Sequence, residues 1–332
     1  MAVNELISII TPTYNRREML SEVIECIGNQ TYKNVELIII DDCSTDGTDQ
    51  MMKKYEDIAW IHYFRNEDNK KDPGMNRYIG YLKARGSYIV FMDDDDFYID
   101  NAFFEKALAV YDEHPDLDLA MVSANAYMQF VEKNNTREER SIGGEGYVDG
   151  REFLLNMGGT HTGLKYKKPL STFTTVFARK ALEKADFATM KMMNDYAIYL
   201  RALLFGNVYI LADYIGVYRI HRNNISTRIT SDFLMRNMEE RVWVKDHMVD
   251  KVPDDRINLW WNKQLQIMLI YYLSGTVPTF KEERKILKWA SEHSKHTFGY
   301  YKAIIISIGS GLFLRVKKLI KQIVKGTGKK LA

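Results

Sequence analysis

The sequence of 332 residues contains two cysteines and few glycine-rich segments. Cys26 and Cys43 cannot build a disulfide framework, and no group of Cys and His residues has the spacing of a zinc site. The patterns G-x-G-x-x-G and G-x-x-x-x-G-K-[ST] are both missing, so neither a dinucleotide-binding Rossmann site nor a P-loop is supported. The first residues also lack the basic segment and long apolar core of a signal peptide. We therefore expect a cytoplasmic start.

The residues that are present give an ordinary globular composition, with 46% hydrophobic and 27% charged residues. The formal net charge of +2 hides an asymmetry, because residues 299–332 carry eight basic side chains and no acidic one. Subtracting these eight from +2 leaves about −6 on the rest of the chain. A basic tail on an acidic body favours a polyanionic partner such as a membrane surface. We expect no nucleic-acid partner.

Short apolar runs rich in β-branched residues predict strands, and helical patterns separate them; the runs are 6–11, 35–40, 60–64 and 87–90. This alternation predicts an α/β fold with a mostly parallel sheet covered by helices. Ligands of such sheets bind at the carboxyl ends of the strands. Three polar segments fall at those ends, and we expect them to share one crevice: 12–15, 41–42 and 93–96.

Four carboxylates, Asp93 to Asp96, follow the fourth predicted strand. Like charges at this spacing disfavour mutual ionisation, and a bound cation would remove that conflict. Hard oxygen ligands of this kind suit Mg²⁺ or Mn²⁺. Taken alone, the run is also compatible with a solvated acidic turn before the helix expected near Asn101.

The pattern changes beyond residue 228. Met, Leu and Trp residues recur there at helical spacing. We predict three parts: an α/β domain over 1–228, a helical region over 229–298 and a basic tail over 299–332. Within the first part, the glycine-rich segment 158–163 is expected to be a mobile substrate lid.

The basic tail has the pattern of an amphipathic helix. Apolar residues from Leu312 to Val324 follow helical spacing, and Lys317, Lys318, Lys321 and Lys325 cluster on the opposite face. Such a helix suits an anionic membrane interface, so we expect residues 300–332 to hold the protein peripherally on the inner face of the cell membrane. The alternative is a surface helix that packs on the protein itself.

Taken in order, several motifs resemble the family 2 glycosyltransferases of GT-A fold. They are residues 8–15 and 30–32, the acidic turn within 36–47, Arg77 with residues 86–89, the DXD-like Asp93-Asp94-Asp95, Asn194-Asp195 and residues 218–221. The resemblance covers about residues 6–228. It implies an inverting, metal-dependent transfer of a sugar from a nucleoside diphosphate donor to a glycan acceptor, expected to be lipid-linked, in surface polysaccharide synthesis.

The resemblance assigns five residues to the donor nucleotide: Pro12, Tyr14, Asp42, Arg77 and Asp94. Asp42 is expected to read the base, and Tyr14 to pack on it. Because a carboxylate can accept the N3–H of uracil, a UDP-sugar is the expected donor. Pro12 would contact the nucleotide through its backbone, Asp94 would lie nearest the ribose, and Arg77 would pair with phosphate or base.

The resemblance also assigns the metal ligands and the catalytic base. Asp95 is expected to bind the divalent ion, Mn²⁺ or Mg²⁺, and His221 to contact that ion or the diphosphate. Asp195 is expected to be the base, because inversion needs a carboxylate opposite the leaving group. Asp195 is also the first residue of a predicted helix, where its negative charge would stabilise the helix through the helix dipole without any catalytic role. Two positions depart from the family pattern. The family usually has an acid where this chain has Asn194, and an Asn where it has Tyr78.

Other functions fit the sequence less well. A nucleotidyltransferase would have a glycine-rich basic opening loop, and a phosphatase of the D-x-D-x-T type requires Thr where Phe97 stands. The main alternative is a catalytically silent sugar- or nucleotide-binding scaffold at the membrane. Asn194 favours that alternative, whereas Asp95 and Asp195 argue against it. The sequence identifies neither the sugar, the acceptor and the linkage nor the oligomeric state.

Overall fold

The computed structural model describes residues 5–133, 136–140, 142–158, 164–221, 230–275 and 280–293. It divides the chain into two compact units, Met1–His221 and Arg222–Ala332. The predicted basic tail lies outside the described residues, and so do residues 159–163 of the predicted lid.

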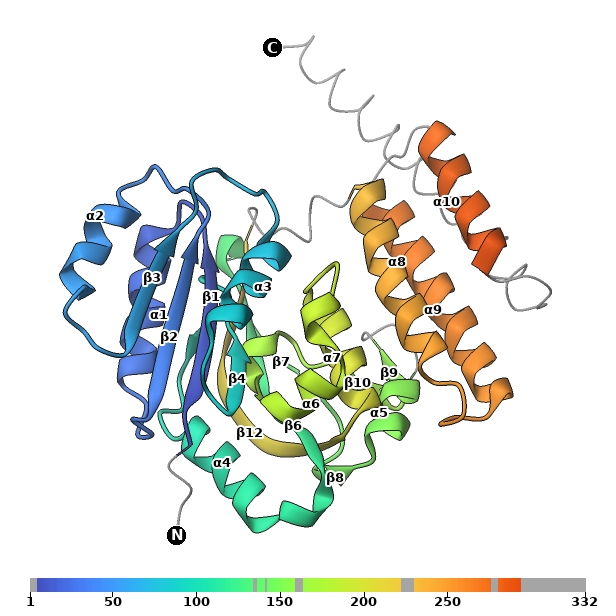
Figure 1. Ribbon diagram of the computed structural model, residues 1–332, viewed down its shortest axis with the longest axis horizontal. Helices are drawn as coiled ribbons and strands as arrows, with labels where there is room; N and C mark the ends of the chain where they lie inside the picture. Colours follow the sequence, from blue (N-terminus) through green and yellow to red (C-terminus); the bar gives the residue numbers. More distant parts are fainter. Residues whose placement is uncertain are drawn as a thin grey trace. The chain divides into compact units, whose positions relative to one another are not determined.

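In the first unit, ten of the described strands form one sheet in the order β3-β2-β1-β4-β11-β6-β12-β5, with β7 beside β6 and β8 beside β12 (Figure 1). Four neighbouring strands run parallel: β1 (Ile7–Thr13), β2 (Val35–Asp41), β3 (Ile61–Arg65) and β4 (Tyr88–Phe91). Every residue of β1 and β2 is buried, as expected for continuous apolar runs covered on both faces. The α/β fold predicted from the sequence is confirmed.

The helices of this unit alternate with the strands, and their bounds are α1 (Arg17–Gly28), α2 (Thr48–Met52), α3 (Pro73–Lys83), α4 (Phe103–Glu113), α5 (Gly150–Asn156), α6 (Arg179–Lys184) and α7 (Asp195–Leu204). Short 3₁₀ turns occur at Lys53–Tyr55, Pro115–Leu117, Val131–Lys133, Thr172–Thr174 and Phe187–Thr189. Helix α3 packs on β1 and β2. It comes close because Gly80 has no side chain there: an added Cβ would lie 2.4 Å from Ile10 Cγ2. This close approach positions Arg77 on α3 beside the strand ends.

The remaining strands complete the other half of the sheet: β5 (Phe97–Tyr98), β6 (Leu119–Phe130), β7 (Thr136–Arg140), β8 (Gly146–Val148), β11 (Thr175–Ala178) and β12 (Asn207–Ile220). Strands β9 (Met157–Gly158) and β10 (Tyr166–Lys167) pair separately. Strand β11 runs antiparallel between β4 and β6. The sequence predicts two short strands at 208–211 and 215–218, but the structure has the single strand β12. Its register with β6 shifts between Ile210 and Gly216, so the break at residues 212–214 is an irregularity within one strand rather than the end of a strand.

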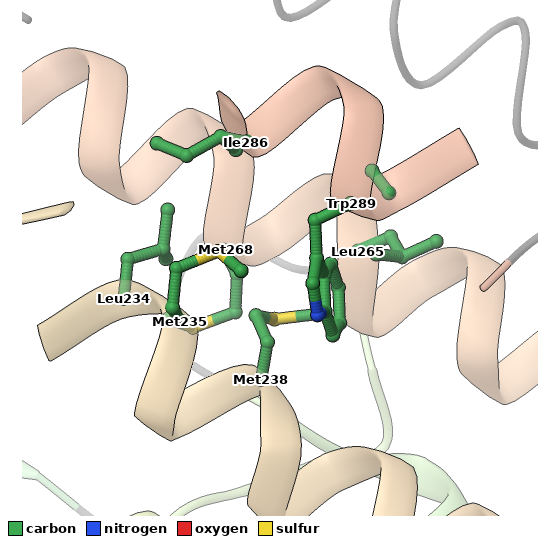
Figure 2. Close-up of a pocket in the computed structure, with 8 residues that line it drawn as sticks. Leu234, Met235, Met238, Leu265, Met268, Ile286 and Trp289 are labelled. Atoms are coloured by element: carbon green, nitrogen blue, oxygen red, sulfur yellow. The ribbon is translucent and has the colours of Figure 1, made fainter. Parts of the chain in front are cut away.

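The second unit contains α8 (Ser231–Asp246), α9 (Asp254–Gly275) and α10 (Phe280–His293). Helix α8 packs against both of the others. Leu234, Met238, Leu265, Met268 and Trp289 are among the side chains that line a small apolar pocket between them (Figure 2). Within the described ranges, none of the helices combines the length and apolar character needed to span a membrane.

Candidate active site

The ends of β1, β2 and β4 meet at one edge of the sheet. The Thr13 hydroxyl at the end of β1 donates a 2.7 Å hydrogen bond to Asp94 Oδ2, beyond the end of β4. The backbone N–H of Asp42, just after β2, donates to the Thr13 carbonyl at 2.9 Å. The structure therefore brings together the three polar segments that parallel strands were expected to place side by side.

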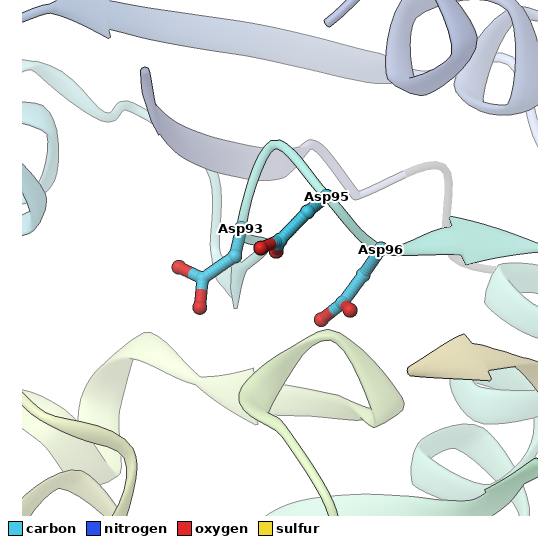
Figure 3. Close-up of side chains that lie close together, drawn as sticks. All are labelled: Asp93, Asp95 and Asp96. Atoms are coloured by element: carbon cyan, nitrogen blue, oxygen red, sulfur yellow. The ribbon is translucent and has the colours of Figure 1, made fainter. Parts of the chain in front are cut away.

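Asp93, Asp95 and Asp96 project from the turn that follows β4 (Figure 3). One carboxylate oxygen from each lies within 4.8 Å of the other two. Burial raises the pKa of Asp96 well above its ordinary value, and the neighbouring Asp95 and Asp93 raise it further. Burial also raises the pKa of Asp93, against the opposing effect of Arg77. The turn therefore holds carboxylates in surroundings that disfavour their negative charge.

Asp94 and Asp95 differ in how their charges are balanced. Burial raises the pKa of Asp94 to about 7, although Arg16 and the Thr13 hydroxyl oppose this shift. Burial alone would also raise the pKa of Asp95, but hydrogen bonding from His221 and the charge of Arg16 hold it below its ordinary value. His221 Nε2 lies 2.9 Å from Asp95 Oδ2. Asp95 is therefore the better anion of the two, which suits the metal-binding role predicted for it.

The acidic turn fits a divalent metal ion. An ion about 2.1 Å from each oxygen holds its ligands roughly 3–4 Å apart, so small side-chain rotations would bring oxygens now within 4.8 Å to that spacing. Asp96 Oδ2 is buried and makes no hydrogen bond of ordinary length and angle with the described residues, although the nearby Ser171 hydroxyl opposes the rise in the pKa of Asp96. A buried acceptor without a donor is costly, and a cation would satisfy it. Carboxylate oxygens are the ligands that suit Mn²⁺ and Mg²⁺.

Arg77 joins the acidic turn to the predicted base. Its Nη1 donates to Asp195 Oδ1 at 2.8 Å and to the Met193 carbonyl at 3.1 Å, while its Nη2 donates to Asp93 Oδ1 at 2.5 Å. Arg77 is buried at 5% exposure. The structure therefore places this arginine between Asp93 and Asp195. The contact with phosphate or base that the resemblance assigns to Arg77 stays a prediction.

Asp195 is the first residue of α7, and Asn194 caps that helix. The Asn194 side chain accepts a 2.9 Å hydrogen bond from the backbone N–H of Ala197, which is the contact that an N-cap residue makes. Lys168 Nζ lies 4.0 Å from Asp195 Oδ2. Asn194, which departs from the family pattern, thus caps a helix in this chain. The Asp195 carboxylate lies between Arg77 and Lys168 and remains partly exposed to solvent.

The predicted base reader, Asp42, already accepts three hydrogen bonds from residues that the structure describes. They come from Asn66 Nδ2 at 3.0 Å and from the backbone N–H groups of Lys70 and Lys71 at 2.8 and 3.1 Å. A carboxylate has about four lone-pair positions, so one remains for a ligand. Tyr14 is 46% exposed at the same edge, whereas Pro12 is buried within β1 opposite Ile40.

Two arginines at this edge were given no role from the sequence. Arg16 Nη1 lies 2.6 Å from Asp94 Oδ1 and 2.7 Å from Asp95 Oδ2. The Arg219 side chain donates to the Asp95 carbonyl, and its backbone N–H donates to Asp96 Oδ1 at 3.3 Å. For Arg219 the available signal was its place within residues 218–221, one of the motifs that carry the resemblance. Arg16 lies just outside residues 8–15 and had no such signal.

A family model described as "Glycosyl transferase family 2" matches residues 8–186, which is more than half of the chain. Among characterised proteins, the GalNAc(5)-diNAcBac-PP-undecaprenol beta-1,3-glucosyltransferase of Campylobacter jejuni is 28% identical over 224 residues, which is 67% of this chain and 67% of that protein. The poly(ribitol-phosphate) beta-N-acetylglucosaminyltransferase TarS of Staphylococcus aureus is 34% identical over 109 residues, which is 32% of this chain and 19% of TarS.

Solved structures of TarS from S. aureus are similar to this chain over most of its length. Residues 1–349 of TarS in complex with UDP-GlcNAc have a TM-score of 0.64 and 18% identity, covering 86% of this chain and 79% of that one. The complex of the same protein with UDP has a TM-score of 0.64 and 20% identity. At these identities the likeness establishes the fold.

Proposed function

Because the chain belongs to glycosyl transferase family 2, we propose that it transfers a sugar from a uridine diphosphate donor to a hydroxyl group of a glycan acceptor, with inversion at the anomeric carbon. The family and the enzyme class predicted from the sequence, a glycosyltransferase, are confirmed. The donor, the inverting course, the metal and the acceptor are the parts that we propose.

The observation that supports this function best is the pairing of Arg77 with both Asp93 and Asp195. One buried guanidinium fixes the candidate base relative to the first residue of the acidic turn. A base and a leaving-group site held at a fixed separation are what an in-line displacement requires. Asp195 reaches solvent, so an acceptor hydroxyl can approach it.

In the proposed mechanism, Asp42 accepts the uracil N3–H at its remaining lone-pair position, Tyr14 packs on the base, and Pro12 contacts the nucleotide through its backbone. Asp94 lies nearest the ribose. Asp95 and His221 would hold a divalent ion, which when bound stabilises the negative charge of the departing diphosphate. Arg77 keeps Asp195 in position during the reaction.

Asp195 then removes the proton of the acceptor hydroxyl as its oxygen attacks the anomeric carbon. The new bond forms on the face opposite the diphosphate, and the bond between the anomeric carbon and the diphosphate oxygen breaks with its electron pair on that oxygen. The proton remains on the Asp195 carboxylate until solvent removes it.

For the donor, support comes from the UDP and UDP-GlcNAc complexes of TarS. For a lipid-linked acceptor, support comes from the name of the C. jejuni relative, which acts on an undecaprenol-linked glycan. We propose the same classes of donor and acceptor here. Residues 300–332 would attach the enzyme to the membrane where a lipid-linked acceptor lies.

The direct test is a screen of UDP-sugars with and without Mn²⁺ or Mg²⁺, measuring UDP release and thermal stabilisation together. We expect at least one UDP-sugar to raise the melting temperature and to release UDP only when the metal is present. Stabilisation without turnover, on any acceptor tried, would favour the silent-scaffold alternative. If no UDP-sugar bound, the proposed donor would be wrong.

The membrane proposal has a separate test. The full chain, a variant lacking 300–332 and a variant with Lys317, Lys318, Lys321 and Lys325 changed to Gln would be sedimented with anionic and neutral vesicles. We expect binding of the full chain to anionic vesicles, and loss of binding in both variants. Unchanged binding after the deletion would contradict the membrane proposal and leave the proposed glycosyltransferase activity unaffected.

A further inference from the structure

Arg16 places a single guanidinium nitrogen between two carboxylates of the acidic turn. Its Nη1 lies 2.6 Å from Asp94 Oδ1 and 2.7 Å from Asp95 Oδ2. Both carboxylates have side chains only 5% exposed, whereas the Arg16 side chain is 20% exposed. A cation therefore already occupies oxygens of the two residues predicted to bind ribose and metal.

The local backbone explains why Arg16 lies there. Asn15 has a left-handed conformation with φ of 52°, and Arg16 follows it as the non-helical residue before α1. The Asn15 side chain accepts a 2.7 Å hydrogen bond from Thr45 N–H, and its own N–H donates to Ser44 Oγ at 2.8 Å. The loop between β1 and α1 is thus tied to the loop after β2, and it presents Arg16 to the turn after β4.

Arg16 and a metal ion compete for the same oxygen. Asp95 Oδ2 accepts from Arg16 at 2.7 Å and lies 2.9 Å from His221 Nε2. An ion bound to this oxygen at about 2.1 Å needs one of the lone pairs now in use. It would also lie a few ångströms from a guanidinium of the same sign, in surroundings where charges are poorly screened. An ion at Asp95 Oδ2 therefore requires Arg16 to move away from this carboxylate.

We propose that Arg16 is an internal counter-cation: it neutralises Asp94 and Asp95 in the ligand-free enzyme and transfers to the donor diphosphate when metal and donor bind. This inference rests on the proposed function, because the diphosphate is the anion that receives the guanidinium. Arginine is well suited to the exchange, since its planar group pairs with carboxylate and phosphate alike.

A coupling between metal and nucleotide follows. Metal alone must displace Arg16 without offering it another anion, so it binds weakly. Once a nucleoside diphosphate is present, the displaced guanidinium gains a phosphate partner, and the same displacement costs less. By linkage, metal and nucleotide then raise each other's affinity by the same factor. Arg16 would therefore make the enzyme load both ligands together.

The test measures Mn²⁺ affinity by titration calorimetry, with and without UDP, in the wild type and in Arg16→Met, Arg16→Lys and Arg17→Met. Arg17 is the matched control because it is the neighbouring cation, is 47% exposed and contacts Asp46 rather than the acidic turn. We expect Arg16→Met to bind Mn²⁺ alone at least about fivefold more tightly, and to show a smaller enhancement by UDP. Arg17→Met should match the wild type.

Arg16→Lys keeps the charge on a flexible stem, and it should lie between the wild type and Arg16→Met. If Arg16→Met does not fold, the wild type is compared with Arg16→Lys instead. The proposal is overturned if Mn²⁺ affinity without UDP is the same in the wild type and in the folded Arg16 variants. It is also overturned if those variants lose the same thermal stability with and without Mn²⁺, since Arg16 would then be a structural brace.

Sugar transfer, measured in the same preparations, separates this inference from the proposed function. A wild type that transfers sugar while its Arg16 variants keep its Mn²⁺ affinity would refute the exchange and leave the function standing. A wild type that binds Mn²⁺ and UDP cooperatively through Arg16, yet transfers no sugar, would support the exchange and refute the proposed function.

Discussion

The two sides of the acidic turn are neutralised by arginines of different character. On one side, Arg77 is buried, donates to Asp93 and Asp195, and is held further by the Met193 carbonyl. On the other, Arg16 joins Asp94 and Asp95 from the start of α1 and is partly exposed. Each pairs two carboxylates, but one link contains the candidate base and the other the candidate metal ligand. We infer that the Arg77 side positions groups and that the Arg16 side exchanges partners.

The strongest test of this difference removes the base on the Arg77 side. Asp195→Asn should lower kcat by about 10²–10⁴-fold, the usual contribution of a general base, because an amide cannot take the acceptor proton. Its oxygen can still accept from Arg77, so Mn²⁺ and UDP affinity should stay near the wild-type values. The measurement is UDP release under saturating donor, together with both binding constants.

Asp116→Asn is the matched control, since Asp116 is an exposed carboxylate in the turn before β6. It should behave as the wild type. Full activity of Asp195→Asn would remove the base assignment, and a large loss of UDP affinity would mean that Asp195 belongs to the donor site instead.

The second prediction compares the two arginines in the metal-free protein. Arg77→Met leaves two carboxylates facing a buried methionine and should lower the free energy of unfolding by about 2–4 kcal/mol, less than for a fully buried pair. The discount applies because the side chains of Asp93 and Asp195 are 31% and 24% exposed. Arg16→Met should cost less, because Asp94, whose pKa burial raises to about 7, can take up a proton once the guanidinium is lost, and His221 Nε2 still lies 2.9 Å from Asp95 Oδ2.

Urea denaturation of both variants measures this difference, with Arg17→Met as the control for loss of one positive charge. Equal losses in Arg77→Met and Arg16→Met would contradict the distinction between a positioning arginine and an exchangeable one. Activity adds a second readout, since Arg77→Met should also misplace Asp195 and lower kcat.

The same contrast shows what the sequence could predict. Strands β1, β2 and β4 are continuous apolar runs, and each is followed by polar residues, so their meeting at one edge follows from parallel pairing. Arg16 gave no such signal, because an arginine at a helix start looks like any solvated side chain. Its partner Asp94 lies 78 positions further along the chain, and no local periodicity encodes a pair at that separation.

Strand β12 was harder to predict for a related reason, and so was the buried face of helix α8, although the helix itself lies in the predicted helical region. The break between the apolar runs 208–211 and 215–218, at Asp213, suggests a turn, yet pairing with β6 continues the strand through its irregularity. Helix α8 buries Asn237 and Arg241, which bond to each other, and Arg241 also donates to Gln264 on α9 at 3.1 Å. Polar side chains that are buried and hydrogen-bonded to a neighbouring helix interrupt the apolar face. The buried face is therefore hard to identify from the amphipathic pattern of the sequence.

A third prediction uses a site that belongs to neither side. Asp42→Asn should weaken UDP binding by about tenfold, in line with losing one hydrogen bond to a charged group, and should leave Mn²⁺ affinity unchanged. The amide can replace some of the oxygen acceptors that now serve Asn66, Lys70 and Lys71, so the fold should survive.

Calorimetry with UDP and with inorganic diphosphate checks this assignment. If Asp42 reads the base, the loss should appear with UDP and be absent with diphosphate. An equal loss for both ligands would show that the loop of Asn66 to Lys71 had shifted, and would leave the base reader unidentified.

The smallest effect we predict is a pH dependence on the Arg16 side. Burial raises the pKa of Asp94 in the folded protein from its ordinary 3.8 to about 7, so between these two values the folded state binds more protons at this residue than the unfolded state. Stability from this group therefore falls as pH rises through that window, and it recovers as pH is lowered. In metal-free protein, the melting temperature of the wild type relative to Asp94→Asn should drop between pH 5 and pH 7.

Asp116→Asn again supplies the control, and its melting temperature should stay parallel to that of the wild type across the same range. Saturating Mn²⁺ with UDP should flatten the dependence, because bound cations hold the Asp94 side of the turn ionised. A wild type and an Asp94→Asn variant that stayed parallel without ligands would mean that Arg16 keeps Asp94 fully ionised. The guanidinium would then be bound too firmly to be exchanged for a metal ion, and the two sides of the turn would no longer differ.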